Sequence, residues 1–155
     1  MPRTDERAAL LHFLAAQRRS ALAVVHGMSE ADAQRSIVPS GWTPISLTVH
    51  LAGVERHWFA FVLGGDAAHT PVRPGTPGTL AEATADYHAE IERSDRLLAG
   101  FSLDEPPTET PEELPGEIRT VRDVVLHVIE ETARHAGHLD VARELLDGRT
   151  GLGPR

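Results

Sequence analysis

The sequence lacks cysteine, which excludes disulfide bonds, thiolate metal ligands and a cysteine nucleophile. It also lacks lysine, because all 15 of its basic residues are arginine. A Schiff-base lysine and the phosphate-binding lysine of a P-loop are therefore excluded. No apolar run approaches the roughly 18 residues of a membrane span, and the N-terminal segment lacks the apolar core of a signal peptide. We expect a cytoplasmic protein without a membrane partner.

Basic charge is also scarce, since the formal net charge at pH 7 is −8. Binding to a nucleic-acid backbone requires a basic surface, so nucleic-acid partners are not expected. The chain has 155 residues, of which 41% are hydrophobic and 25% are charged. This composition is typical of a globular protein with a hydrophobic core, and it predicts a single domain over residues 1–155.

Apolar residues recur with helical spacing in four long stretches, and no stretch shows the alternation of a strand. The predicted helices cover residues 4–26, 44–63, 80–100 and 119–148. Thr43 followed by Pro44, Thr79 and Thr120 are suitable N-terminal caps, and Gly148 suits the C-terminal end of the last helix. These features predict an all-α fold, a four-helix bundle with long crossover connections.

The connections between the predicted helices leave the order of helix directions open. Residues 64–78 are rich in glycine and proline, and residues 102–118 are rich in proline and acidic side chains. Both are expected to be exposed loops. The first and the third connections are each long enough to cross the bundle.

The strongest functional signal lies in the last predicted helix. His127, Glu131 and His135 follow one another at i, i+4 spacing, and His138 comes three residues later. Such residues share one helix face, so imidazoles and a carboxylate interrupt an otherwise apolar surface. Burying these groups is costly unless they are paired, and a divalent metal is one possible partner. Glu131 and His135, with His50 from the second helix, would supply three ligands and leave a coordination position open for water or substrate. The alternative is a hydrogen-bonded polar cluster without a metal.

The other polar residues near this face have several possible roles. His127 has three candidate roles: a further metal ligand, a residue that contacts the ligands, or a substrate contact. His57 and His138 are better placed to contact the ligands or to line the wall of the pocket. Arg134 is a candidate contact for an anionic cofactor or substrate group, with an ordinary surface arginine as the alternative. Glu130 is interpreted as a surface charge, because it points about 100° away from the stripe.

Two segments resemble the DinB-like superfamily of bacterial four-helix metal proteins. They are Gly41-Trp42-Thr43 with the following His50-Leu51-Ala52, and the last helix with Glu131 and His135. The likeness is strongest to the branch related to mycothiol-dependent maleylpyruvate isomerase. It implies a divalent metal held by His50, Glu131 and His135, and a homodimer. Glu131, where many relatives carry histidine, favours the mycothiol-linked branch.

The resemblance implies a metal-dependent enzyme that transfers a low-molecular-weight thiol, such as mycothiol, to a small electrophile. The metal would bind the thiol as its thiolate, and His57, His127 or His138 would assist proton transfer. Zn is the favoured metal, and Ni, Fe or Mn is also compatible with nitrogen and oxygen ligands. Two alternatives remain: a metal-dependent hydrolase of a small ester or amide, and a non-catalytic dimeric stress or binding protein with a structural metal.

Overall fold

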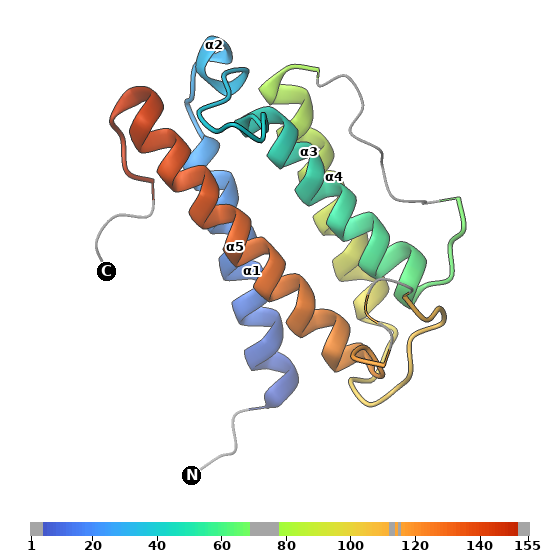
Figure 1. Cartoon of the computed structure of the whole chain (residues 1–155). Coiled ribbons are helices and arrows are strands. Elements are labelled where there is room, and N and C mark those ends of the chain that lie inside the picture. The colour runs from blue at the N-terminus through green and yellow to red at the C-terminus, as the bar shows by residue number, and fades with distance from the viewer. Residues whose placement is uncertain (1–4, 69–77, 112–113, 115, 152–155) are drawn as a thin grey trace.

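The computed structural model describes residues 5–68, 78–111, 114 and 116–151 (Figure 1). These residues form helices joined by turns and loops, and none of them lies in a strand, as the sequence predicts. No helix in the described part of the chain has the length and apolar character needed to cross a bilayer. The elements are α1 (Glu6–Val25), the short α2 (Glu30–Ala33), α3 (Pro44–Glu55), η1 (Arg56–Leu63), α4 (Leu80–Leu98) and α5 (Val121–Asp147).

The long helices form two pairs. The helices within a pair are parallel, and the two pairs run in opposite directions. α1 and α5 lie side by side and point the same way, while α3 with η1 and α4 point the other way (Figure 1). The end of η1 and the start of α4 therefore lie at opposite ends of the bundle. The first and third connections, which are long enough to cross the bundle, do not cross it. Each joins two helices at the same end of the bundle. The crossover is thus the glycine- and proline-rich second connection.

The predicted N-terminal caps start three of the long helices. The hydroxyls of Thr43, Thr79 and Thr120 each accept a hydrogen bond from the backbone N–H three residues later, in a capping box. Pro44 occupies the first turn of α3, where its missing N–H has no helical partner to lose. α5 ends at Gly148, whose φ of 75° lies in the left-handed region that favours glycine. These caps fix where the site-bearing helices α3 and α5 begin.

The second predicted helix changes its winding halfway along. It is α-helical to Glu55 and then continues as the π-helix η1. The wider turn continues beyond it, since the amide of Gly64 donates to the carbonyl of Phe59 at 2.9 Å. Because each turn then contains more residues, side chains after Arg56 no longer follow the α-helical face that carries His50. π-helical turns are often found at functional sites.

A buried ion pair connects three of the helices inside the bundle. Both oxygens of Glu55 on α3 accept hydrogen bonds from Arg18 on α1, each at 2.7 Å. The third arm of Arg18 donates to Asp95 on α4, also at 2.7 Å. The side chains of Arg18 and Glu55 are only 3% and 1% exposed. This network joins α1, α3 and α4 through the interior.

Candidate metal centre

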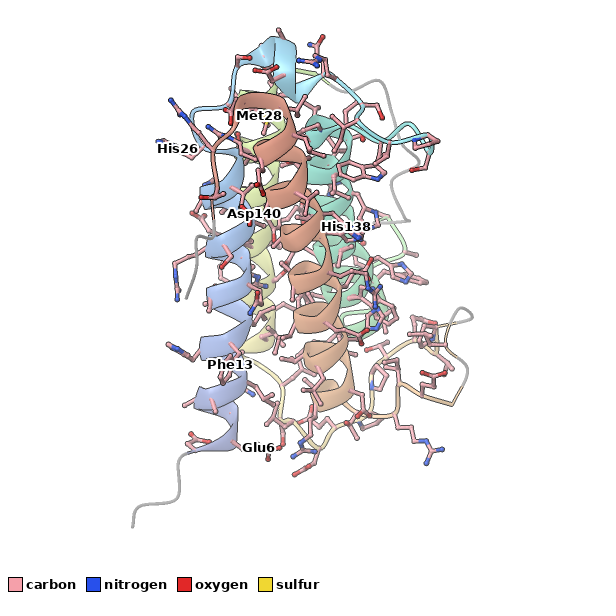
Figure 2. All side chains as sticks on the ribbon, turned by 60° about the vertical axis from the view of Figure 1, so that its left-hand side comes forward. Glu6, Phe13, His26, Met28, His138 and Asp140 are labelled. Carbon is pink, nitrogen blue, oxygen red and sulfur yellow. The ribbon has the colours of Figure 1, made fainter. Side chains whose placement is uncertain are left out.

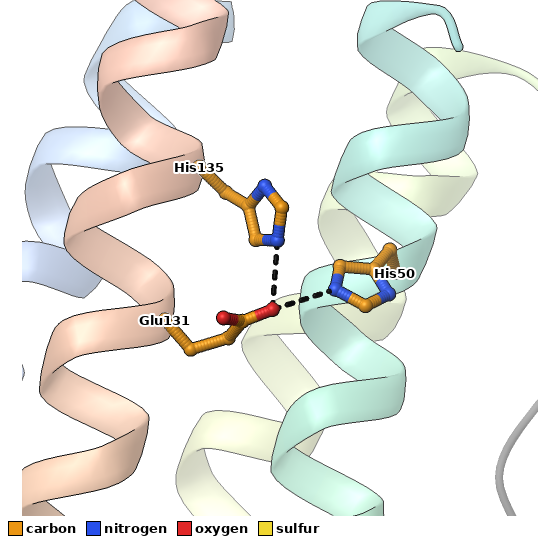
Figure 3. Close-up of side chains that lie close together, drawn as sticks. All are labelled: His50, Glu131 and His135. Atoms are coloured by element: carbon orange, nitrogen blue, oxygen red, sulfur yellow. Dashed lines mark hydrogen bonds and ion pairs between the residues drawn. The ribbon is translucent and has the colours of Figure 1, made fainter. Parts of the chain in front are cut away.

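The structure brings His50, Glu131 and His135 together between α3 and α5 (Figure 3). Glu131 and His135 lie one turn apart on α5, and His50 faces them from α3. The Nε2 atoms of both histidines point at the same carboxylate oxygen, Oε1 of Glu131, at 3.3 Å from His50 and 2.8 Å from His135. One ligand atom from each residue lies within 4.8 Å of the others. Glu131 and His135, whose spacing on α5 was predicted, are therefore joined by His50 from a helix that is distant in the sequence.

The chemistry and the spacing of these donors suit a small divalent cation. In a tetrahedral zinc site with bonds of about 2.0–2.2 Å, ligand atoms lie about 3.3 Å apart. The distance between His50 and Glu131 has this value, and the 2.8 Å between His135 and Glu131 would open slightly around an ion. Two imidazoles and a carboxylate are also common ligands of zinc and of neighbouring transition metals. The residues present therefore fit the metal that the resemblance implies.

The triad is sheltered on the α5 side and open on the α3 side. The side chains of Glu131 and His135 are 16% and 15% exposed, whereas that of His50 is 48% exposed. A small molecule can therefore approach the donors from the side of His50. This arrangement resembles that of a catalytic metal site more than that of a closed structural one.

The surroundings favour the protonation states that metal binding needs. Burial raises the pKa of Glu131, but hydrogen bonds from His135 and His50 outweigh burial and leave that pKa below its usual value. Burial lowers the pKa of His135, against the opposing influence of Glu131. At neutral pH the carboxylate is therefore ionised and the imidazole of His135 is neutral, and these are the forms that bind metals.

Arg134 lies beside the triad on α5 and contacts two carboxylates. One arm of its guanidinium donates to Oε2 of Glu131 at 2.6 Å, and another donates to Oε1 of Glu130 at 2.5 Å. The sequence suggested Arg134 as a contact for an anionic group and Glu130 as a surface charge. Glu130 is indeed 67% exposed, and it forms an ion pair with Arg134.

Of the three other predicted site histidines, His138 contacts the triad. It projects from α5 on the side of α3 (Figure 2), and its Nδ1 lies 3.4 Å from Nδ1 of His135. The ring of Trp42 is near it, with 6.0 Å between ring centroids. Trp42 was not expected at the site, although its position just before the N-cap of α3 places it at the start of a ligand-bearing helix.

His57 and His127 gather around Trp58 of η1. The ring centroid of His127 on α5 lies 4.2 Å from that of Trp58. The ring centroid of His57, the residue just before Trp58, lies 5.0 Å from the Trp58 ring. Burial lowers the pKa of His127, against the opposing influence of Glu131. His127 is therefore a neutral imidazole at neutral pH. These two histidines belong to an aromatic group beside the triad.

Comparison with known proteins assigns the chain to a family. No curated protein sequence matches the chain. The profile of the mycothiol-S-transferase family matches residues 9–148, which include both helices of the triad. This match covers most of the chain, so the protein belongs to the mycothiol-S-transferase family, within the DinB-like superfamily that its sequence resembles.

Proposed function

We propose that the protein is a divalent-metal-dependent S-transferase that joins a low-molecular-weight thiol, mycothiol or a close relative, to a small electrophile. The observation that carries this proposal is the convergence of His50, Glu131 and His135 within 4.8 Å, in a chain of the mycothiol-S-transferase family. Zinc suits the donor set, and Ni, Fe or Mn would be accepted by the same ligands.

The proposed reaction exchanges a leaving group for the thiol sulfur. The S–H proton is lost, the sulfur forms a bond to an electrophilic carbon, and the leaving group departs with the electron pair of its broken bond. A bound divalent metal would supply the acidity, because an open coordination position lowers the pKa of a thiol or water that occupies it.

The histidines around the triad supply candidate proton acceptors. His138 is the candidate nearest to the ligands, since it contacts His135. His127, neutral at neutral pH, can also accept a proton and shares the aromatic group at Trp58 with His57. We propose that these three histidines assist proton transfer or orient the thiol.

The proposal predicts an activity that requires both a thiol and a metal. Purified protein, reconstituted with zinc, is expected to consume 1-chloro-2,4-dinitrobenzene in the presence of mycothiol and to release chloride. Removing the metal with a chelator is expected to abolish this activity, and adding zinc back should restore it. Chloride release and the absorbance of the thioether product measure the rate.

The same assay distinguishes the alternative functions. Turnover of an activated ester without thiol would instead identify a metal-dependent hydrolase. If neither reaction occurs and metal removal only lowers the melting temperature, the protein is a binding protein with a structural metal. Either result would overturn the proposed transferase.

We also propose that the protein is a homodimer, the assembly that the resemblance implies. Val141 and Leu145, one turn apart on α5, are 56% and 67% exposed, and Phe13, at the surface of α1 (Figure 2), is 58% exposed. Exposed apolar groups of this kind are common at subunit contacts. Equilibrium sedimentation is expected to give twice the 16.8 kDa chain mass, and Leu145→Glu should shift the equilibrium toward monomer. A wild type that sediments as a monomer at high micromolar concentration would contradict the dimer.

A further inference from the structure

The two oxygens of Glu131 have different partners. Oε1 faces the Nε2 atoms of His50 and His135, at 3.3 and 2.8 Å. Oε2 accepts a hydrogen bond from Nη1 of Arg134 at 2.6 Å. The carboxylate therefore presents one oxygen to the triad, while the other is already occupied.

Arg134 is itself held in place by a second carboxylate. Its Nη2 donates to Glu130, four residues earlier on α5, while Glu131 lies three residues earlier. Both pairs have the spacings that bring side chains together on a helix surface. The planar guanidinium has its donors in a fixed fork, so two bonds to adjacent carboxylates fix its orientation as well as its position.

We propose that Arg134 is a positioning residue that keeps Glu131 a one-oxygen ligand and thereby keeps a coordination position free for the substrate. This inference rests on the metal centre of the proposed function. A carboxylate can bind a cation through one oxygen or through both. If Oε2 lost its bond to Arg134, it would be free to turn toward the ion as an additional ligand, which would raise the coordination number and obstruct the position that a thiol needs.

Two effects of Arg134 on the metal act in opposite directions. Orienting Glu131 favours binding, whereas a positive charge beside a divalent cation opposes it. The charge effect is weakened because Glu130 pairs with Arg134 and because the Arg134 side chain is 51% exposed to screening solvent. Metal affinity alone is therefore a poor measure of the positioning role. The coordination number of the bound ion is a better one.

The test uses the full-length protein loaded with Co²⁺, whose visible absorption becomes weaker as its coordination number rises. Arg134→Met, which keeps the side-chain stem and removes all donors, is expected to weaken this absorption. The same variant is expected to bind azide, a small competing ligand for the open position, about tenfold less tightly than the wild type. Arg134→Lys keeps the charge and one donor and should restore much of both properties. Arg96→Met, which removes an exposed arginine paired with Glu92 on α4, is the control and should match the wild type.

The outcomes separate this proposal from the proposed function. If wild-type protein binds no Co²⁺, the metal centre is wrong and the role of Arg134 falls with it. If the wild type binds Co²⁺ and Arg134→Met has the same spectrum and azide affinity, only the positioning role is wrong. It is also wrong if Arg134→Met stays folded by circular dichroism but binds no Co²⁺, because Arg134 would then act on affinity.

Discussion

Replacing His135 by alanine is expected to lower zinc affinity by more than about 100-fold. Residues that only orient metal ligands typically contribute about 10–100-fold to affinity, and loss of a ligand should exceed that range. Three side chains converge on the candidate centre among the residues that the structure describes, so two of these donors would remain. His50→Ala is expected to behave in the same way, although its side chain lies on a different helix and is 48% exposed. Metal content after purification and zinc titration against a competing chelator measure the effect.

Two further variants make this prediction specific. Glu131→Gln keeps the size of the side chain but removes its charge, so it should weaken zinc binding while leaving the packing of α5 intact. His88→Ala removes an exposed histidine from α4 and should bind zinc as the wild type does. A His135→Ala protein that retains wild-type zinc affinity would show that the metal binds elsewhere or through other residues.

The ligand spacing on α5 could be predicted from the sequence, because residues four positions apart on a helix always share a face. The approach of His50 could not be derived in this way. It depends on which faces of α3 and α5 oppose each other, so His50 was only a candidate partner, which the family resemblance then supported. The roles of Arg134 and Glu130 were also out of reach, because a hydrogen bond to one particular carboxylate oxygen depends on side-chain conformation.

The helix boundaries were predictable for a similar local reason. Thr43, Thr79 and Thr120 cap their helices through bonds that span three residues, which a sequence reveals directly. The direction of each helix and the winding of η1 depend on packing between distant parts of the chain. The sequence therefore favoured an uninterrupted α-helix over residues 44–63, and the structure changes it to a π-helix at Arg56.

The buried pair of Arg18 and Glu55 was also missed, although the sequence held a signal for it. Arg18 lies four residues after Leu14 and three before Ala21, on the buried face of α1. A charge at such a position requires a buried partner. Glu55 is the corresponding acidic residue within the apolar stretch of α3 and η1. The spacing of apolar residues shows that each charge lies on a buried helix face. It does not show that the two side chains contact each other.

Breaking this pair is expected to have the largest effect on stability. Glu55→Leu would leave the guanidinium of Arg18 in the core with only Asp95, whose side chain is 59% exposed. Removing one partner of a buried ion pair typically costs about 3–5 kcal/mol. In a protein of this size that corresponds to a fall in melting temperature of about 6–20 °C. Urea and thermal unfolding followed by circular dichroism measure both quantities.

Removing both charges should be less harmful than removing one. The double variant Arg18→Met with Glu55→Leu replaces the pair by apolar groups of similar size, and such replacements are often neutral or stabilising. We therefore expect it to recover most of the stability that Glu55→Leu loses. Asp95→Asn, which alters only the exposed member of the network, should cost less than about 1 kcal/mol. If the double variant is as unstable as Glu55→Leu, the loss comes from altered packing between α1 and α3, because no unpaired charge remains in it.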